Sequence, residues 1–411
     1  MFCSKLHYEK NQVKCTRNGR KLMNEKSLLN LRKFLAPEIV YGQGSINLAG
    51  RHAKSLGASK VFIVTDPGVR KAGWACIVEK SLKDSDIEYT IFDSVSENPK
   101  DHEVMTGVDI CRNEGCDLIV SVGGGSPMDC AKGIGVMMGN PGNIIDYEGV
   151  DMIPNPGPPM IFIPTTAGTS ADVSQFAIIT NTLKKVKIAI ISKMVIPDIA
   201  LIDPETTMTM PRDLTAATGM DALCHAFEAY VSNAASPLTD MAALTSVEII
   251  ADNLHRAFQE PQNIVHRDKM MTASLMAGLA FSNAGLGLVH GMAHSLGGAM
   301  GLAHGECNAL LLEKVVQFNY PAASEKYDRL AKAFHIDLSG KNEQERGAAI
   351  SYQIEKLRNR LGIHHRLVDL GVKSSDISKL SEFAFGDPCL ATNPRDADLE
   401  DIKKIYFQVY E

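Results

Sequence analysis

The stretch IVSVGGGSPMDCAKGIG, residues 119–135, carries the pattern that decides the fold of the N-terminal half. An apolar, β-branched run leads into three glycines, and the residues that follow suit the start of a helix. Ser126 fits the N-cap, Pro127 the first helical position and Asp129 the third, as in a capping box. The glycines let the backbone approach a ligand, and the free amides of a helix N-terminus suit a pyrophosphate. A plain βα turn is the alternative, because the stretch is not the GxGxxG fingerprint.

Similar apolar runs recur on both sides of this stretch and alternate with helical patterns. Strands are expected at KVFIVTD (60–66), DLIVSV (117–122), MIFIPTT (160–166) and, within 187–203, at KIAIIS and DIALID, with helices around 71–84 and 101–115. Continuous apolar strands that alternate with helices predict a parallel, Rossmann-like sheet covered on both faces. Ligands bind such sheets in the crevice beyond the carboxyl ends of the strands.

Two further strand ends support a dinucleotide. Asp66 closes an earlier strand, where a carboxylate accepts from a ribose 2′-hydroxyl and repels a 2′-phosphate, which favours NAD over NADP. The loop PTTAGTSAD sets Thr165, Thr166 and Thr169 after another strand, and its hydroxyls suit phosphate and ribose. Taken with the glycines Gly124 and Gly125, the three loops predict a bound NAD.

The strand pattern stops after Pro211, and amphipathic helices follow it to the end of the chain. Within DMAALTSVEIIADNLHRAF (240–258), apolar residues recur at helical intervals, as they do in EKYDRLAKAF, AAISYQIEKLRNRL and DLEDIKKIYFQVY. The sequence therefore predicts an α/β dinucleotide-binding domain over residues 31–208 and an all-helical, metal-binding domain over residues 209–411.

A metal site is predicted from histidines in FSNAGLGLVHGMAHSLGGAMGLAHGE, residues 281–306. His290 and His294 are four residues apart, so on a helix their rings share one face, and His304 follows. Far upstream, Asp221 and His225 repeat this spacing. Imidazole and carboxylate without thiolate suit iron(II), zinc or manganese. Ordinary helix histidines are the alternative, which two paired spacings in apolar, glycine-flanked segments disfavour.

Composition narrows the class of protein. The chain has 411 residues, of which 45% are hydrophobic and 22% charged, as in an ordinary globular protein. A formal net charge of −6 gives no electrostatic case for a nucleic-acid partner, and no apolar run is long enough to span a bilayer. The nine cysteines form no CxxC pair, so a reduced cytoplasmic location is expected rather than a disulfide framework.

The first residues differ from the rest. Residues 1–22 hold six basic side chains against one acid, with no sustained amphipathic pattern. We expect residues 1–30 to be a flexible basic N-terminal extension. A targeting segment and a true start at Met23 are the alternatives.

Several long motifs resemble the iron-containing (group III) alcohol dehydrogenases, with the greatest similarity to the lactaldehyde reductase and propanediol dehydrogenase branch. The motifs are GGGSPMDCAK, IPTTAGTSADV, ATGMDALCHAFEAYVS, GLGLVHGMAHSLGG and NPRDADLEDI, spread over residues 31–411. The resemblance implies a dehydroquinate synthase-like architecture, an α/β domain followed by an all-α domain, and a homo-oligomer that is a dimer or larger.

Carried over residue by residue, the resemblance assigns the site. It implies one divalent ion, iron(II) before zinc, with Asp221, His225, His290 and His304 as ligands, and His294 as the unliganded catalytic histidine. It implies NAD bound by Asp66, Gly124, Gly125, Ser126, Asp129, Thr165, Thr166, Thr169 and Lys187. Phe176 is a departure, because relatives often carry asparagine there, and the substrate preference of a relative is therefore not carried over.

The expected function is hydride transfer between NAD(H) and a short-chain primary alcohol or aldehyde in the cleft between the domains, with His294 relaying the alcohol proton. Glycerol-type dehydrogenases and dehydroquinate synthase-like lyases use a similar cleft, but the GMAH segment argues against both. LRKFLAPEIVYG (31–42) is similar to a subgroup linked to the regulation of bacterial ethanol oxidation. A catalytically weak sensor of the same fold is therefore the alternative.

Overall fold

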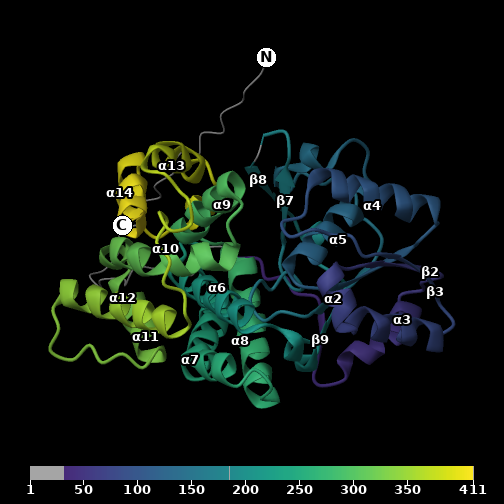
Figure 1. The fold of residues 1–411 in the computed structure, drawn as a ribbon, viewed down its shortest axis with the longest axis horizontal. Coiled ribbons are helices and arrows are strands. Elements are labelled where there is room, and N and C mark those ends of the chain that lie inside the picture. The colour runs from purple at the N-terminus through teal and green to yellow at the C-terminus, as the bar shows by residue number, and fades with distance from the viewer. Residues whose placement is uncertain (1–31, 185, 411) are drawn as a thin grey trace, which may run out of the picture. The chain divides into compact units, whose positions relative to one another are not determined.

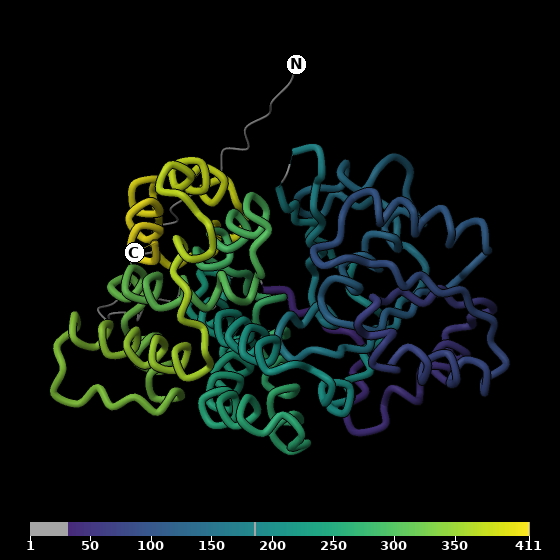
Figure 2. Tube along the Cα trace, in the orientation of Figure 1, coloured from purple at the N-terminus to yellow at the C-terminus, as the bar shows by residue number. Residues whose placement is uncertain are grey.

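The computed structural model describes residues 32–184 and 186–410, and residues 34–411 form one compact unit. The basic extension predicted over residues 1–30 lies outside the described residues. Within the compact unit, strands and their covering helices occupy the first half of the chain and helices the second (Figure 1). The tube in Figure 2 follows this change from purple and blue to green and yellow.

Six parallel strands form the main sheet, in the order β1-β9-β6-β4-β2-β3. They are β1 (Glu38–Tyr41), β2 (Lys60–Val64), β3 (Glu88–Phe92), β4 (Leu118–Gly123), β6 (Met160–Pro164) and β9 (Ile199–Ile202). The central strands β4 and β6 are buried at every position, as a sheet covered on both faces requires. The parallel sheet predicted from the apolar runs is confirmed.

Helices cover both faces of this sheet. They are α1 (Ala49–Ser55), α2 (Pro67–Ala72), α3 (Trp74–Asp84), α4 (Asp101–Asn113) and α5 (Gly125–Gly139). Along β2, Val61 and Ile63 belong to the core under α1 and α3, whereas Phe62 and Val64 belong to the core under α4 and α5. This alternation is the two-residue period of a strand. The helix expected around 71–84 is broken at Gly73, whose φ of 92° ends α2 and precedes α3.

One expected strand belongs elsewhere. KIAIIS forms β8 (Val186–Ile191), which pairs antiparallel with β7 (Phe176–Asn181) and parallel with the short β5 (Gly149–Val150) in a separate three-stranded sheet. Only DIALID enters the parallel sheet, as β9. Strand β7 ends at Asn181 and β8 begins at Val186, and strands joined by so short a connection pair antiparallel.

Helices fill the second half of the described chain. They are α6 (Arg212–Val231), α7 (Pro237–Gln259), α8 (Ile264–Ala284), α9 (Leu288–Met300), α10 (His304–Asn319), α11 (Ser324–Ala333), α12 (Glu343–Arg360), α13 (Ile377–Phe385) and α14 (Leu399–Tyr410). Helix α6 is buried along nearly its whole length and packs against α7, α8 and α10, while α10 also packs against α9. Three helices that carry predicted ligands therefore meet in one core.

Among the described residues, no single helix is both long and apolar enough to cross a membrane. Helices α8 and α9 reach that length and composition only when they are taken together, and a bend of 100° separates them.

Candidate functional site

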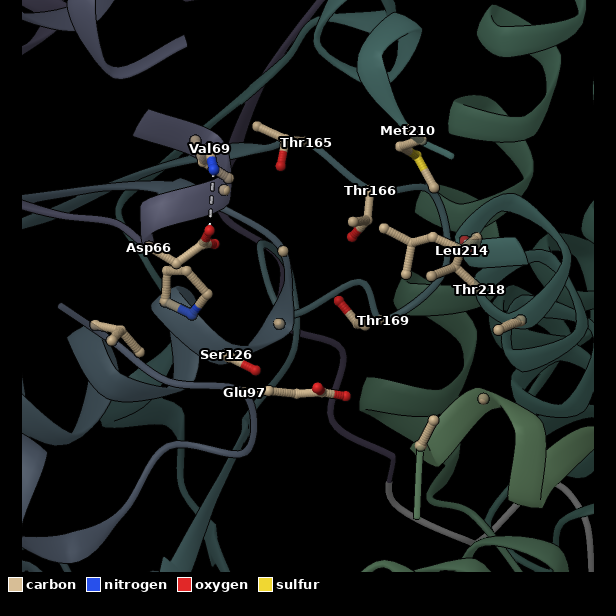
Figure 3. Close-up of a pocket in the computed structure, with 18 of the residues that line it drawn as sticks. Asp66, Val69, Glu97, Ser126, Thr165, Thr166, Thr169, Met210, Leu214 and Thr218 are labelled. Carbon is tan, nitrogen blue, oxygen red and sulfur yellow. Dashed lines mark hydrogen bonds between the residues drawn. The ribbon is translucent and has the colours of Figure 1, made fainter. Parts of the chain in front are cut away.

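A cleft of about 740 Å³ lies where the carboxyl ends of the sheet strands face α6 and α10. Its lining includes most of the predicted cofactor residues, namely Asp66, Gly124, Gly125, Ser126, Thr165, Thr166 and Thr169. Figure 3 shows the hydroxyls of the three threonines directed into the cleft, with Asp66 and Ser126 on one side of it and Leu214 and Thr218 of α6 on the other. The cleft therefore lies at the strand ends where a dinucleotide is expected.

The glycine turn differs in one respect from the prediction. Helix α5 begins at Gly125 with Gly124 as N-cap, so Ser126 lies inside the first turn, where its hydroxyl accepts from the Asn98 N–H at 3.3 Å. A serine cap is thus wrong. Added Cβ atoms at Gly124 and Gly125 would lie 3.1 Å from the methyl groups of Thr166 and Thr169, so glycine allows the two loops to close on each other. The first helical amides are left for a ligand.

Two polar atoms of the cleft fit a nucleotide. Thr166 Oγ1 is buried and has no hydrogen-bond partner among the described residues, so it is available to a phosphate or ribose. Asp66 caps α2, because its Oδ1 accepts from the Val69 N–H at 2.9 Å. The second oxygen of its carboxylate has no hydrogen bond to α2 and can accept from a ribose hydroxyl.

The predicted metal ligands converge. Asp221 and His225 come from the middle of α6, His290 from the first turn of α9, and His304 from the start of α10. Asp221 Oδ1 lies 3.7 Å from His225 Nε2, 3.7 Å from His290 Nε2 and 3.9 Å from His304 Nε2. Ligand atoms about 2.1 Å from a tetrahedral ion are roughly 3.4 Å from one another. The ligand atoms of Asp221, His290 and His304 lie within 4.8 Å of one another, which fits one divalent ion, and His225 adjoins this set through Asp221.

Glycine also allows this convergence. A Cβ at Gly305 would stand 2.5 Å from the Ala217 carbonyl oxygen of α6, and one at Gly168 would stand 2.3 Å from the Thr218 carbonyl oxygen. These contacts bring the start of α10 and the threonine loop against α6, one turn before Asp221. The histidine-bearing helix end and the cofactor loop thus meet on the same helix.

Outer partners hold two of the imidazoles with Nε2 facing Asp221. His290 Nδ1 donates to Glu228 Oε2 at 2.6 Å, and His225 Nδ1 donates to the Gly168 carbonyl oxygen at 3.2 Å. Such partners fix the tautomer and orientation of a ligating histidine. Sequence reasoning missed Glu228, although its seven-residue spacing from Asp221 on α6 was a usable signal.

Burial and neighbouring charges keep most of the proposed ligands in the deprotonated form that binds a cation. Burial lowers the pKa of His225 to about 4 and holds the pKa of His304 well below its ordinary value, so both rings keep their lone pairs at neutral pH. Burial opposes ionisation of Asp221, yet the three imidazoles bring its pKa well below the usual range. Burial also opposes protonation of His290, but the carboxylates of Glu228 and Asp221 outweigh it and raise the pKa of His290 to about 9. A cation bound there displaces that proton.

His294 stands apart from the ligand set. Its Nδ1 donates to Asp387 Oδ2 at 2.8 Å, and its ring stacks on that of His304 with centroids 5.3 Å apart. Burial would raise the pKa of Asp387, but His294 and the Cys389 N–H lower it to about 2, so the residue is a carboxylate. Asp387 lies 93 positions along the chain from His294, so no local spacing in the sequence predicted that the two side chains meet.

A second, inner cavity of about 140 Å³ adjoins the ligand set. Two predicted cofactor residues, Asp129 and Lys187, line this cavity and not the larger cleft. The two spaces share Ser126, Thr169 and Asp221 among their walls, so the cleft leads directly to the predicted ligands. Burial raises the pKa of Asp129 to about 6 and lowers that of Lys187.

Apolar side chains form one part of the wall of the inner cavity. Phe176 and Phe281 are in contact, with ring centroids 5.7 Å apart, and Phe281 stacks on His225 at 4.2 Å. Leu286 lines the same cavity. Behind this wall, the fully buried Lys132 donates from Nζ to the carbonyl oxygens of Ser174 and Phe176 at 3.0 and 2.6 Å. No pattern in the sequence pointed to this role for Lys132.

Comparison with known proteins covers both halves of the chain. Residues 36–204 match the family described as iron-containing alcohol dehydrogenase, and residues 215–410 match the Fe-containing alcohol dehydrogenase family, C-terminal part. The chain is 40% identical to 1,3-propanediol dehydrogenase of Citrobacter freundii over 92% of this chain and 98% of the relative. It is 38% identical to NAD-dependent methanol dehydrogenase of Bacillus methanolicus, over 90% of this chain and 98% of the relative. A crystal structure of 1,3-propanediol oxidoreductase superposes with a TM-score of 0.90 at 40% identity, covering 93% of this chain and all of the other.

Proposed function

The chain belongs to the iron-containing alcohol dehydrogenases, and on that premise we propose that it transfers a hydride between NAD(H) and a short-chain primary alcohol or aldehyde. One observation carries the proposal: the large cleft and the imidazole–carboxylate cluster are continuous, and both Asp221 and His304 line the cleft. A nicotinamide that enters from the strand ends is thereby brought against the cluster.

The cofactor part of the proposal assigns NAD to the cleft. The amides at the start of α5 and the hydroxyls of Thr165, Thr166 and Thr169 take the phosphates and nicotinamide ribose, and Asp66 takes the adenosine ribose. Asp129 and Lys187 take the nicotinamide end, because they line the inner cavity. A 2′-phosphate beside Asp66 would face a carboxylate, which supports NAD over NADP.

The metal part assigns one divalent ion, iron(II) before zinc, to Asp221, His225, His290 and His304. When bound, such an ion supplies Lewis acidity toward the alcohol or carbonyl oxygen. Glu228 and the Gly168 carbonyl orient His290 and His225, and the side chains of Asp221, His225 and His290 are buried, while His304 borders the cleft.

His294 is the proposed proton relay. Asp387 accepts from its Nδ1, which leaves Nε2 as the nitrogen that accepts the proton of the alcohol. The carboxylate stabilises the imidazolium that results, as in other carboxylate–histidine pairs. His294 lines the inner cavity, so it reaches the substrate without serving as a ligand.

The inner cavity supports a short, apolar substrate. The cavity is small, Phe176, Phe281 and Leu286 form an apolar side of it, and its charged side chains Asp129 and Lys187 are assigned above to the nicotinamide. We therefore propose an unbranched primary alcohol with one hydroxyl as the preferred substrate. The proposed substrate differs from that of the relative from Citrobacter freundii, which is named for the diol 1,3-propanediol.

The setting completes the proposal. We divide the chain at residues 208 and 209 into a cofactor domain and a metal domain, in line with the two family matches on either side. The cysteines among the described residues are free, which suits a reducing cytoplasm. A homo-oligomer, dimer or larger, is proposed from the family resemblance.

The test is NADH formation with methanol, ethanol, 1-propanol, 1-butanol and 1,3-propanediol, measured separately on iron- and zinc-loaded protein. We expect turnover with NAD, and higher kcat/KM for the monohydric alcohols than for the diol. If saturating metal and NAD give no turnover with any alcohol or aldehyde, the proposal fails. That result would favour the alternative of a catalytically weak sensor with the same fold. Preference for the diol would refute the substrate assignment alone.

A further inference from the structure

Asn308 is a polar side chain beside the ligand set to which no role has been assigned above. It lies on α10 four residues after His304, so the two side chains share one face of the helix. Its side chain is fully buried, in a helix that packs against both α6 and α9. Its Oδ1 is buried without a hydrogen-bond partner among the described residues, so the hydrogen bonds that offset its burial are those of Nδ2.

The amide contacts the cluster directly. Asn308 Nδ2 lies 2.6 Å from Asp221 Oδ1, which is a short and well-formed hydrogen bond to a carboxylate. It also lies 3.2 Å from the Nε2 atoms of His290 and His304. Among the side chains the structure describes, Asn308 is the one whose amide hydrogen bonds to Asp221. The backbone carbonyl of Asn308 accepts from Cys224 Sγ at 3.5 Å, which also ties α10 to α6.

The other members of the cluster show why this contact matters. His290 is oriented by Glu228 and His225 by the Gly168 carbonyl, so each of these imidazoles has one partner outside the set. Asp221 is the only anionic member, and a carboxylate on a helix keeps rotational freedom about χ2 unless a donor restrains it. Asn308 supplies that donor from the helix that carries His304.

We infer that Asn308 is a positioning residue for the metal site: it fixes the carboxylate of Asp221 and ties the ligand on α6 to the ligand on α10. The inference rests on the ligand set proposed above. Its expected effect is on metal affinity, because outer-shell partners of ligands typically contribute about 10- to 100-fold.

The test is the dissociation constant for Co²⁺ and Zn²⁺, measured by competition with a chromophoric chelator, together with the absorption spectrum of the Co²⁺ protein. Asn308→Ala is expected to weaken binding by about 10- to 100-fold and to alter the Co²⁺ spectrum. Asn140→Ala is the matched control. Its amide is also buried and hydrogen-bonded, to the carbonyls of Val136 and Asn155, but it lies at the other end of α5 from the glycine turn.

Each outcome decides. Affinity within about threefold of the wild type and an unchanged spectrum would overturn the inference, as would an equal loss in Asn140→Ala. If Asn308→Ala does not fold, Asn308→Ser gives the same test, and unchanged affinity there overturns it equally. Asp221→Ala separates the two levels. If it retains metal, the ligand set itself is wrong; if it loses metal while Asn308→Ala does not, only the present inference fails.

Discussion

The helical half and the α/β half present their functional groups in opposite ways. Asp221 and His225 lie in the interior of α6 and His290 in the first turn of α9. All three are nearly inaccessible to solvent and are held by other buried side chains or by backbone. The cofactor cleft is open and is lined by loop hydroxyls and by the free amides of one helix end. A compact ion needs a rigid, dry cluster, whereas a long dinucleotide needs an extended surface that it can enter and leave.

This difference sets how each half responds to substitution. Removing one ligand from a closed set of four leaves buried donors unpaired and destroys the site. Removing one contact from an extended surface leaves the others in place, so the loss is partial. The predictions below begin with the closed cluster, continue with the open cleft, and end with the packing that supports the wall of the inner cavity.

His290→Ala is expected to have the largest effect. It removes one of four proposed ligands and leaves the Glu228 carboxylate buried without its partner, so bound metal and alcohol-dependent activity should both fall to background. Metal content by mass spectrometry and NADH formation measure the two losses. His255→Ala, on the half-buried face of α7, is the control and should retain both. Stoichiometric metal in His290→Ala would remove His290 from the ligand set.

His294→Ala is expected to keep its metal and its NAD affinity while kcat falls by about 10²- to 10⁴-fold, the usual contribution of a positioned acid–base group. Asp387→Asn should lower kcat in the same direction, because it removes the carboxylate that orients the ring. Loss of metal in His294→Ala would make this residue a ligand. Near-normal kcat with metal retained would make it a packing residue.

Substitution of Asp66, in the open cleft, is expected to have a smaller effect. Asp66→Ser keeps a side-chain oxygen to cap α2 but removes the charge that repels a 2′-phosphate. The ratio of kcat/KM for NADP to that for NAD is expected to rise about tenfold or more, since about 1.4 kcal/mol corresponds to a factor of ten. Asp66→Gly, which also loses the cap, should show the same shift with slightly lower stability. An unchanged ratio would mean that the adenosine ribose lies elsewhere.

Lys132→Met tests the packing behind the wall of the inner cavity that Phe176 forms. It should lower the free energy of unfolding by about 1 to 3 kcal/mol, because the carbonyls of Ser174 and Phe176 lose their donor. Burial lowers the pKa of Lys132 from 10.5 to about 8. Between those values the unfolded chain binds more protons than the folded chain, so the wild type gains stability as pH rises and the variant does not.

The difference in the free energy of unfolding between the wild type and Lys132→Met, measured by urea titration, should therefore grow from about pH 8 to about pH 10. Lys80→Met, at an exposed site on α3, is the matched control and should show no such growth. A difference that stays constant across this pH range would mean that Lys132 stays protonated in the folded protein, as it does in the unfolded chain.

The sequence predicted more of the closed cluster than of the open cleft. Four-residue spacing on a helix fixes which side chains share a face, so Asp221 with His225 and the position of His290 followed from local rules. The family, the fold class and the cofactors NAD and iron were also predicted and are confirmed at the level of the family. The individual ligand and cofactor assignments stay predictions.

What the sequence did not predict depends on contacts between distant segments. Asp387 meets His294 across 93 positions, and Lys132 meets Phe176 across 44, so no local pattern pointed to either pair. The edge strands β1 and β3 are half exposed and lack the continuous apolar pattern by which the central strands were found. The helix start at Gly125 was missed because cap preferences favoured Ser126, whereas the close approach of the threonine loop favours glycine.

The central claim is that one ion, held jointly by α6, α9 and α10, is required for hydride transfer between NAD and an alcohol. Its most direct test is to strip the protein with a chelator and follow ethanol-dependent NADH formation as Fe²⁺ or Zn²⁺ is added back. We predict no activity in the stripped protein, and a linear rise that saturates at one ion per chain. Full NADH formation by the stripped protein, or saturation only at two ions per chain, would contradict the claim.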